Sequence, residues 1–169
     1  LLTIAGIKIL YTGDIKLEPT QLHAGADLSF GTVHTLICEA TYGDREHPDR
    51  KQTERAFVDE ISQTIKQGGS VIIPVFALGR AQEILMLVGT AQEAGNLPEK
   101  VPYYLDGMAA SATELVLRFP ETINNAPLLA KFFRRARRIS GFRERVAAVK
   151  KQGIFITTSG MLTGGPVMQ

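Results

Sequence analysis

The chain has 169 residues, of which 44% are hydrophobic and 21% are charged, and its formal net charge is +2. This length and composition allow one core of ordinary size, which excludes disorder over most of the chain. The single cysteine, Cys38, excludes a disulfide framework and fits a reducing compartment such as the cytoplasm; we expect it to be a small buried hydrophobe. Lys8 interrupts the apolar opening before a membrane-length run develops, so we expect no membrane partner.

Residues 1 to 48 contain two predicted strands, Ile7 to Thr12 and Thr35 to Ala40, joined by a loop from Ile15 to Gly31. No helix is predicted to cover these strands, and two strands alone cannot form a core. The chain also enters its first strand without a Met or a polar lead-in. We therefore expect residues 1–48 to be an incomplete domain of a truncated chain.

The remainder of the chain alternates short apolar strands with helices. Helices are predicted from Thr53 to Lys66, ending at Gly68, and from Ala81 to Ala94. Strands are predicted at Val71 to Phe76, Val101 to Leu105 and Ile154 to Thr158. This alternation is typical of a parallel sheet covered on both faces by helices, so residues 49–169 should form a three-layer α/β domain.

Between the last two of these strands, the chain devotes more residues to helical patterns than one crossover requires. The helical patterns run from Ala109 to Phe119, from Pro127 to Arg138 and from Gly141 to Lys151. We expect an elaborated edge or a cap in this region.

The charge is distributed unevenly. Residues 131–151 contain nine basic side chains and one acidic side chain, Glu144. The basic residues are Lys131, Arg134, Arg135, Arg137, Arg138, Arg143, Arg145, Lys150 and Lys151. Such a stretch predicts either a polyanionic partner or a solvated helical face.

Two carboxylates accompany the first two strands, and ligands of open parallel sheets bind beyond the carboxyl ends of strands. Asp14 is a metal ligand, a turn former or a helix cap. Glu39 lies in an apolar strand, where we expect it to be buried and to need a histidine, an arginine or a metal as partner. The three histidines have no HxH or HExxH spacing, so the chain contains no self-sufficient zinc site.

Glycine-rich turns follow the later strands, at Gly79 before Arg80 and in the run from Ser159 to Gly165. A turn of this kind that enters a helix presents backbone N–H groups to anions, and the Arg80 guanidinium would add a forked cation. These turns predict a ligand that carries phosphate, but glycines also reverse the chain in α/β proteins without any ligand. Neither a Walker A loop nor a GxGxxG sequence follows a strand.

Five segments, which together cover essentially the whole chain, occur in the same order and at the same spacing in the β-CASP nucleases of the metallo-β-lactamase superfamily. The chain resembles the archaeal homologues of the endonuclease subunit of the cleavage and polyadenylation specificity factor, and more loosely bacterial RNase J. The segments are Tyr11-Thr-Gly-Asp14, Glu39-Ala-Thr-Tyr-Gly43, Pro74-Val-Phe-Ala-Leu-Gly-Arg-Ala-Gln-Glu83, Tyr104-Leu-Asp-Gly107 and Ser159-Gly-Met-Leu-Thr-Gly-Gly165.

The resemblance implies a zinc-dependent ribonuclease that hydrolyses RNA phosphodiester bonds in RNA 3′-end processing or decay. Residues 1–48 would be a remnant of an αββα metallo-β-lactamase domain, and residues 49–169 an incomplete β-CASP domain. Asp14 matches the aspartate that bridges two zinc ions, which then activate water and stabilise charge on the phosphate. Glu39 matches an acidic residue that holds a later histidine for proton transfer or metal contact.

The resemblance also assigns RNA contacts. Arg80 and the loop residues Ser159, Gly160, Thr163 and Gly164 match segments that face the metals and grip the RNA backbone, which positions the substrate and reads little sequence. The basic stretch would attract RNA, with an affinity that falls as salt rises.

The family's HxHxDH motif and later histidines are absent from this sequence. A single aspartate cannot hold zinc at useful affinity, so we expect the chain by itself to be metal-free and inactive. The intact Asp14 and Glu39 favour a longer parent protein that binds two zinc ions and acts as an RNA endonuclease or 5′-exonuclease.

Three alternatives are also compatible with these residues. The first is a non-catalytic β-CASP paralogue that binds RNA or scaffolds a processing complex, and the second is an α/β module that binds mononucleotides. The third is DNA as the substrate. Partners besides RNA would be a second copy of the chain or a processing complex.

Overall fold

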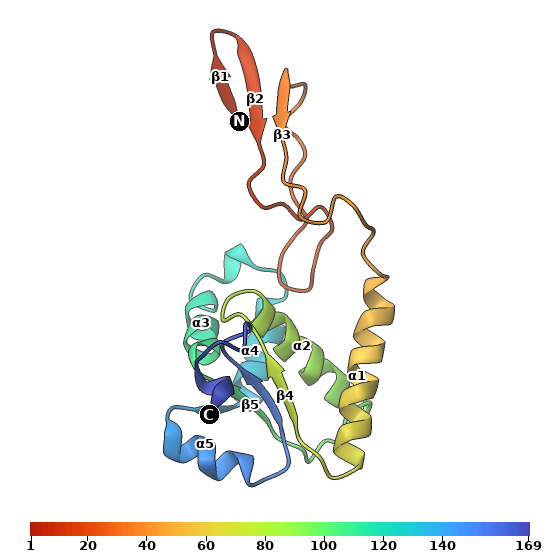
Figure 1. Ribbon diagram of the computed structural model, residues 1–169, viewed down its shortest axis with the longest axis vertical. Coiled ribbons are helices and arrows are strands. Elements are labelled where there is room, and N and C mark those ends of the chain that lie inside the picture. Colours follow the sequence, from red (N-terminus) through yellow and green to blue (C-terminus); the bar gives the residue numbers. More distant parts are fainter.

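The computed structural model describes residues 1–169 as two separate sheets (Figure 1). The linker from residue 38 to residue 49 leads from the smaller sheet to the body, and the loop from residue 12 to residue 34 reaches the body and returns. The smaller sheet has the order β1-β2-β3 and stands apart from the main body. The larger sheet has the order β4-β7-β5-β6 and lies among five α-helices. No helix combines the length and the apolar character needed to cross a membrane.

The smaller sheet consists of β1 (Leu2–Ile4), β2 (Ile7–Tyr11) and β3 (Thr35–Ile37). β1 was not predicted, because the apolar residues of β1 and β2 form one nearly continuous run in the sequence. Ala5 and Gly6 have φ values of 48° and 82°, and a two-residue turn of this kind folds β1 antiparallel onto β2. β2 and β3 run parallel.

Both faces of the smaller sheet carry exposed apolar side chains. Ile4 and Ile37 are 61% and 51% exposed, and Leu36 on the opposite face is 57% exposed. Within residues 1–48 only Leu22 is fully buried, and it belongs to the core of the larger sheet.

The larger sheet is parallel throughout, as the alternation of strands and helices predicts. It contains four strands, which are β4 (Val71–Pro74), β5 (Tyr103–Asp106), β6 (Arg137–Ile139) and β7 (Ile154–Thr157). The expected α/β fold class with a parallel sheet is confirmed.

Alternate residues of the central strands enter two different cores. Tyr103 and Leu105 of β5 belong to the main core, whereas Tyr104 points to the other face and stacks on Phe155 of β7, with ring centroids 4.7 Å apart. Four helices contribute to the main core, and one helix covers the second face. The sheet is thus the middle of three unequal layers.

The four helices of the main core are α1 (Arg50–Lys66), α2 (Arg80–Glu93), α3 (Met108–Val116) and α4 (Ala126–Arg135). α1 begins three residues before the predicted start, because the Asp49 carboxylate accepts a hydrogen bond from the Gln52 N–H at 2.7 Å and caps the helix. α5 (Phe142–Val149) covers the second face through Ala148. Short 3₁₀ turns occupy Pro120–Thr122 and Pro166–Met168.

The prediction of a helix through Arg138 was wrong at its end. α4 stops at Arg135, Ala136 is extended, and Arg137–Ile139 pairs with β5 as the edge strand β6. The local apolar pattern favoured a helix, but the unpaired edge of β5 supplies backbone hydrogen bonds that only the folded chain can offer. The expected elaborated edge therefore contains a strand as well as helices.

The carboxyl ends of the two sheets point toward each other. β2 and β3 run toward the body, and β4, β5 and β7 run toward the smaller sheet (Figure 1). Residues that follow strands in both sheets are consequently brought to the junction between them.

Candidate functional site

Asp14 and Glu39 lie on adjacent chain segments at the carboxyl end of the smaller sheet. The Thr12 N–H donates to the Ile37 carbonyl at 3.0 Å, which extends the pairing of β2 and β3 by one residue. The Glu39 N–H donates to the Thr12 hydroxyl oxygen at 3.3 Å. The structure therefore brings the two predicted carboxylates to the same end of the same sheet.

The Glu39 carboxylate is held by backbone N–H groups. It accepts a hydrogen bond from the Thr41 N–H at 2.8 Å. Hydrogen bonds from the Thr41 backbone and side chain, with a further one from the Ile15 backbone, outweigh the small effect of burial and lower the pKa of Glu39 below its usual value. Glu39 is thus an ionised acceptor bonded to the residue that follows Asp14.

Two expectations for this region were wrong. Glu39 is half-exposed and lies beyond the end of β3, and Cys38 is exposed instead of buried. Both expectations assumed a strand that continues to residue 40 inside a core, whereas β3 ends at Ile37 in a sheet that has exposed faces.

Arg80 begins α2, directly after the turn that leaves β4, and its side chain is exposed. Gln82 fixes this turn. Its carbonyl oxygen accepts from the Gly79 N–H at 2.7 Å, and its amide nitrogen donates to the Ala77 carbonyl at 3.0 Å and to the Thr113 hydroxyl at 2.7 Å. Gln82 is fully buried, so the turn before Arg80 is rigidly tied to α3.

The glycine-rich loop from Ser159 to Gly165 lies against the same turn. A Cβ on Gly160 would meet the backbone of Val75 and Phe76 at 3.0 and 3.1 Å, which explains why the closest approach is made by a glycine. The Phe76 carbonyl also accepts from the Ala81 N–H at 3.2 Å. Arg80 and the loop therefore flank one short piece of backbone at the carboxyl edge of the larger sheet.

Part of the loop between β2 and β3 packs on the body. It links the region of Asp14 and Glu39 to the region of Arg80 and the glycine-rich loop. We call residues 20–23 the anchor segment. Leu22 is fully buried in the main core, and its N–H donates to Oε1 of Glu83 at 3.2 Å. Glu83 lies less than one helical turn from Arg80. The segment that follows Asp14 thus packs beside the start of α2.

A second feature of the carboxyl edge is a hollow of about 670 Å³ beside β5 and β6. Arg145 lines it and forms an ion pair with Asp106 at the end of β5. The Thr158 hydroxyl accepts from the Met108 N–H at 3.2 Å and joins β7 to α3. Ser159 and Gly165 form part of the wall, so the glycine-rich loop separates this hollow from the turn at Arg80.

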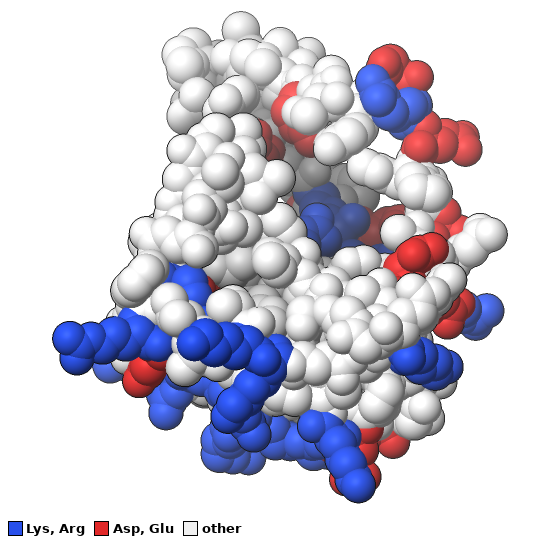
Figure 2. Space-filling model, turned by 60° about the horizontal axis from the view of Figure 1, so that its bottom comes forward, with Lys and Arg blue, Asp and Glu red and all other residues white.

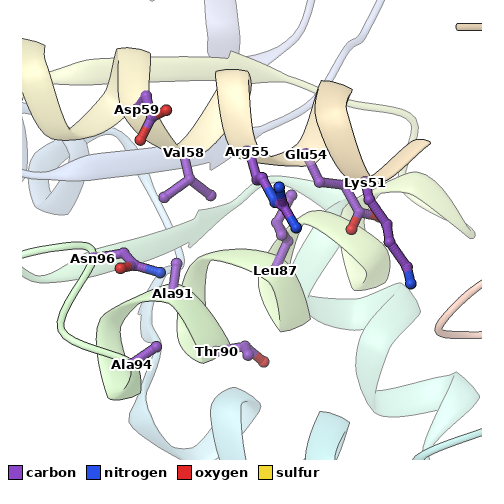
Figure 3. A pocket seen from close by; sticks show the side chains of 10 residues that line it. All are labelled: Lys51, Glu54, Arg55, Val58, Asp59, Leu87, Thr90, Ala91, Ala94 and Asn96. Carbon is purple, nitrogen blue, oxygen red and sulfur yellow. The ribbon is translucent and has the colours of Figure 1, made fainter. Parts of the chain in front are cut away.

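Another hollow, of about 450 Å³, lies between α1 and α2 (Figure 3). Its floor is formed by Val58, Leu87 and Ala91, and charged side chains such as Lys51 and Asp59 line α1 along one side. This hollow is built from the sides of helices and includes no residue that follows a strand. It therefore takes no part in the candidate site.

The basic stretch has fewer cations available to bind a polyanion than its sequence implies, because four of its nine cations form ion pairs within the chain. Lys131 and Arg135 pair with Glu93, Arg138 pairs with Glu114, and Arg145 pairs with Asp106. Five exposed cations form no ion pair. We call four of them, Arg134, Arg137, Lys150 and Lys151, the basic face; the fifth, Arg143, lies in the first turn of α5.

The basic face lies near the amino ends of the strands of the larger sheet, whereas Arg80 lies near their carboxyl ends. Arg137 begins β6, and Lys150 and Lys151 precede β7, so these residues mark the amino ends of parallel strands. Figure 2, which brings the bottom of Figure 1 forward, shows Lys and Arg crowded along the lower left of that view. The basic face is thus remote from Asp14 and Glu39.

The residues of this chain do not complete a zinc site. Residues 1–169 contain no cluster of three or more His, Cys, Asp or Glu side chains arranged to hold a metal. Protein zinc sites use three or four such ligands. Asp14 can supply one ligand, and Glu39 is already committed to backbone N–H groups.

Sequence reasoning assigned no role to six polar residues that support the site. Gln82, Glu83, Asp106 and Thr158 are buried, and Arg50 and Arg145 are partly exposed. A partial signal existed for Gln82 and Glu83. Both are polar residues in the first turn of an otherwise apolar helix, where the helix must dock against the turn before it. The partners of the other four could not be found from spacing.

The chain is similar to one protein family and to several curated proteins. The family described as "Beta-Casp domain" matches residues 81–169. "Probable RNase MJ4" of Methanocaldococcus jannaschii is 42% identical over 95% of this chain and 37% of its own length. "RNase aCSPSF2" of Saccharolobus solfataricus is 37% identical over 95% of this chain and 32% of its own length.

A third relative, "Transcription termination factor FttA" of Methanococcus maripaludis, is 36% identical over 95% of this chain and 27% of its own length. The chain therefore spans about a third of the length of the curated relatives it matches. The match to the family covers more than half of the chain, and it includes the turn after β5 and the glycine-rich loop, but it begins one residue after Arg80. The chain belongs to the β-CASP family.

Proposed function

We propose that this chain is part of a zinc-dependent ribonuclease and supplies one metal-binding aspartate together with an RNA-gripping surface. The observation that carries the proposal is the pair Asp14 and Glu39, placed side by side at strand ends that point toward Arg80 and the glycine-rich loop. The names of the relatives, two of them RNases, support RNA as the substrate.

Asp14 has the properties that a metal ligand requires. Its side chain is exposed at the end of β2, and it forms no ion pair within the chain, so its carboxylate is free to bind a cation. The neighbouring Glu39 is ionised and fixed by hydrogen bonds, which suits an acceptor that orients a histidine from another part of the protein. Zinc would supply Lewis-acid chemistry when it is bound by Asp14 and by ligands outside residues 1–169.

Arg80 and the loop residues Ser159, Gly160, Thr163 and Gly164 have the properties of a phosphate-binding surface. The Arg80 guanidinium is exposed, and it is unpaired. The loop is exposed or half-exposed from residue 159 to residue 165. The N–H groups of Met161 and Leu162 are bonded to Ser159, whereas no hydrogen bond within the chain engages the Thr163 hydroxyl. A surface of this kind binds the RNA backbone and holds a strand against Asp14 and Glu39 without selecting a base sequence.

The test is made in the longer protein that contains this chain. Zinc content and cleavage of labelled RNA are compared for the unmodified protein, Asp14→Ala and the control Asp44→Ala. Asp44 is an exposed carboxylate paired with its neighbour Arg45, outside the proposed site. We expect Asp14→Ala to lose zinc and cleavage, and the control to retain both.

Equal cleavage by the unmodified protein and Asp14→Ala would remove the role proposed for Asp14. A DNA strand of the same sequence is tested in parallel, because preferential cleavage of DNA would refute RNA as the substrate. A protein that binds RNA without cleaving it in the presence of zinc would be a non-catalytic paralogue.

A further inference from the structure

The smaller sheet is connected to the body by two stretches of chain. The loop between β2 and β3 descends to the body through the anchor segment and returns. The second stretch runs from β3 to Arg50 at the start of α1. Both stretches meet at one carboxylate, Glu83 of α2, which is only 8% exposed.

The first connection is made by Leu22. Its side chain is fully buried in the main core, and its N–H donates to Oε1 of Glu83 at 3.2 Å. Two further hydrogen bonds hold the same segment, from the Asn124 N–H to the Leu22 carbonyl at 2.7 Å and from the Asn125 side chain to the Gln21 carbonyl at 2.8 Å. The anchor segment makes all the hydrogen bonds that join residues 1–48 to residues 50–169.

The second connection is made by Arg50. Its guanidinium donates to Oε2 of Glu83 at 2.5 Å, and its Nε donates to Glu54 at 2.7 Å within α1. The two carboxylate oxygens of Glu83 therefore bind different segments: Oε1 binds the anchor segment, and Oε2 binds the first residue of α1. Arg50 follows directly after the linker that descends from β3.

We propose that Glu83 is a positioning residue that sets the orientation of the sheet bearing Asp14 and Glu39 relative to Arg80 and the glycine-rich loop. The two stretches of chain would otherwise act as a hinge, because hinges consist of a few loop or element-terminal residues that absorb backbone rotation. Fixing both stretches at one rigid point of α2 removes this freedom. Arg80 begins the same helix, so its distance from Asp14 depends on the Glu83 contacts.

The charge of Glu83 supports this role. Burial works to raise the pKa of Glu83, but the hydrogen bonds from Thr20 and Arg50, the Arg50 charge and the Leu22 N–H together lower it below the usual value. Glu83 is thus a charged acceptor at neutral pH. Hydrogen bonds to an ionised acceptor are shorter and stronger than those between neutral groups.

The experiment measures the orientation directly in the 169-residue chain. Cys38 is the only cysteine, is exposed and lies on the smaller-sheet side, so it accepts one spin label. The second label is placed on the body through Lys66→Cys at the exposed end of α1. Distances between the labels are measured by pulsed electron resonance in the unmodified background, in Glu83→Ala, in Arg50→Gln and in the matched control Glu54→Gln.

We expect one narrow distance distribution in the unmodified background and in Glu54→Gln, which removes a carboxylate from Arg50 but leaves the anchor segment untouched. The distribution should broaden by about twofold or more in Glu83→Ala and in Arg50→Gln. Hydrogen exchange of the β7 amides verifies that the body of each variant is folded. If Glu83→Ala does not fold, Arg50→Gln decides the question alone. If Glu83→Ala and Arg50→Gln are folded and their label-to-label distance distributions are as narrow as that of the unmodified chain, the inference is overturned.

A second arm rests on the proposed function and uses RNA cleavage by the longer protein. Glu83→Ala should reduce kcat by about 10- to 100-fold with little change in KM, because the RNA-gripping surface is intact while the carboxylates are misplaced. Equal losses of kcat and RNA affinity would indicate a merely structural role and contradict the inference. A broadened distribution in a parent protein that never cleaves RNA would refute the nuclease and leave the positioning role standing.

Discussion

Asp106 and Arg145 form a bidentate ion pair at the carboxyl end of β5. The Arg145 Nε donates to Oδ2 of Asp106 at 2.6 Å, and its Nη2 donates to Oδ1 at 2.9 Å. The two side chains are only 4% and 12% exposed. The hydrogen bonds and charge of Asp106 raise the pKa of Arg145 further above its usual value, so the Arg145 guanidinium is charged at all ordinary pH values. The pair ties α5 to the edge of the sheet where the candidate site lies.

Asp106→Asn should destabilise the chain by about 3–5 kcal/mol, because it leaves a nearly buried guanidinium without its counter-charge. The matched control is Glu114→Gln, which removes the partner of Arg138 in a pair that is 57% and 50% exposed. We expect the control to cost less than about 1 kcal/mol, since water already solvates that pair. Urea denaturation measures both values, and comparable losses would show that burial does not govern the contribution of these pairs.

Gly89→Ala should destabilise the chain although alanine is the better helix former. An added Cβ would lie 2.8 Å from Cδ2 of Phe132 and even closer to two other atoms of this fully buried ring. The overlap should cost about 1–3 kcal/mol, more than the gain of about 1 kcal/mol in helix propensity. Thr90→Ala, on the exposed side of the same helix, is the control.

Thermal unfolding of Gly89→Ala should show a lower Tm than that of the unmodified chain. Adding Phe132→Leu to Gly89→Ala should restore part of the loss, because the smaller side chain makes room for the Cβ. Strictly additive effects in this double-mutant cycle would contradict direct contact between the two residues.

The contribution of Glu83 to stability should depend on pH. Burial alone would raise the pKa of Glu83, but hydrogen bonds from Thr20 and Arg50 and the Arg50 charge lower it below the usual 4.5. A carboxylate whose folded pKa is lowered contributes stability above the unfolded pKa and loses it as the pH falls through the folded pKa. The difference in unfolding free energy between the unmodified chain and Glu83→Gln should therefore be constant near neutral pH and should shrink below pH 4.5.

Urea denaturation at a series of pH values measures this difference. The control is Glu54→Gln, which shares Arg50 as a partner but is more exposed than Glu83. A difference between Glu83→Gln and the unmodified chain that stays the same at acid pH would contradict an ionised, hydrogen-bonded Glu83.

The basic face should contribute to RNA affinity through charge alone. Replacing Lys150 and Lys151 by Gln removes two exposed cations that form no ion pair. The plot of log affinity against log salt for single-stranded RNA should become shallower by about 0.7 for each RNA phosphate that is no longer neutralised by a lysine. Lys131→Gln is the control, because its ammonium is paired with Glu93 at 2.7 Å. Filter binding in the longer protein measures the slopes, and an unchanged slope would mean that the basic face merely faces water.

Local patterns of the sequence determined much of the body. The apolar runs of β4, β5 and β7 have the length of strands buried on both faces, and the helices between them end close to Gly68 and Gly95, where the pattern predicts. Parallel pairing follows from this alternation, since each helix must bring the chain back to the same edge. The placement of Asp14, Arg80 and the glycine-rich loop after strands could be predicted for the same reason.

The tertiary structure alone decided the features that depend on residues far apart in the sequence. β6 exists because β5 offers an open edge, and Glu39 is half-exposed because β3 ends early in a sheet without a core. Nothing in the loop that contains Leu22 predicts its burial beside Glu83, 61 residues away. Hydrophobic periodicity is a local property and locates strands and helices, whereas the pairing of buried charges and the docking of a loop depend on which surfaces the finished fold leaves unsatisfied.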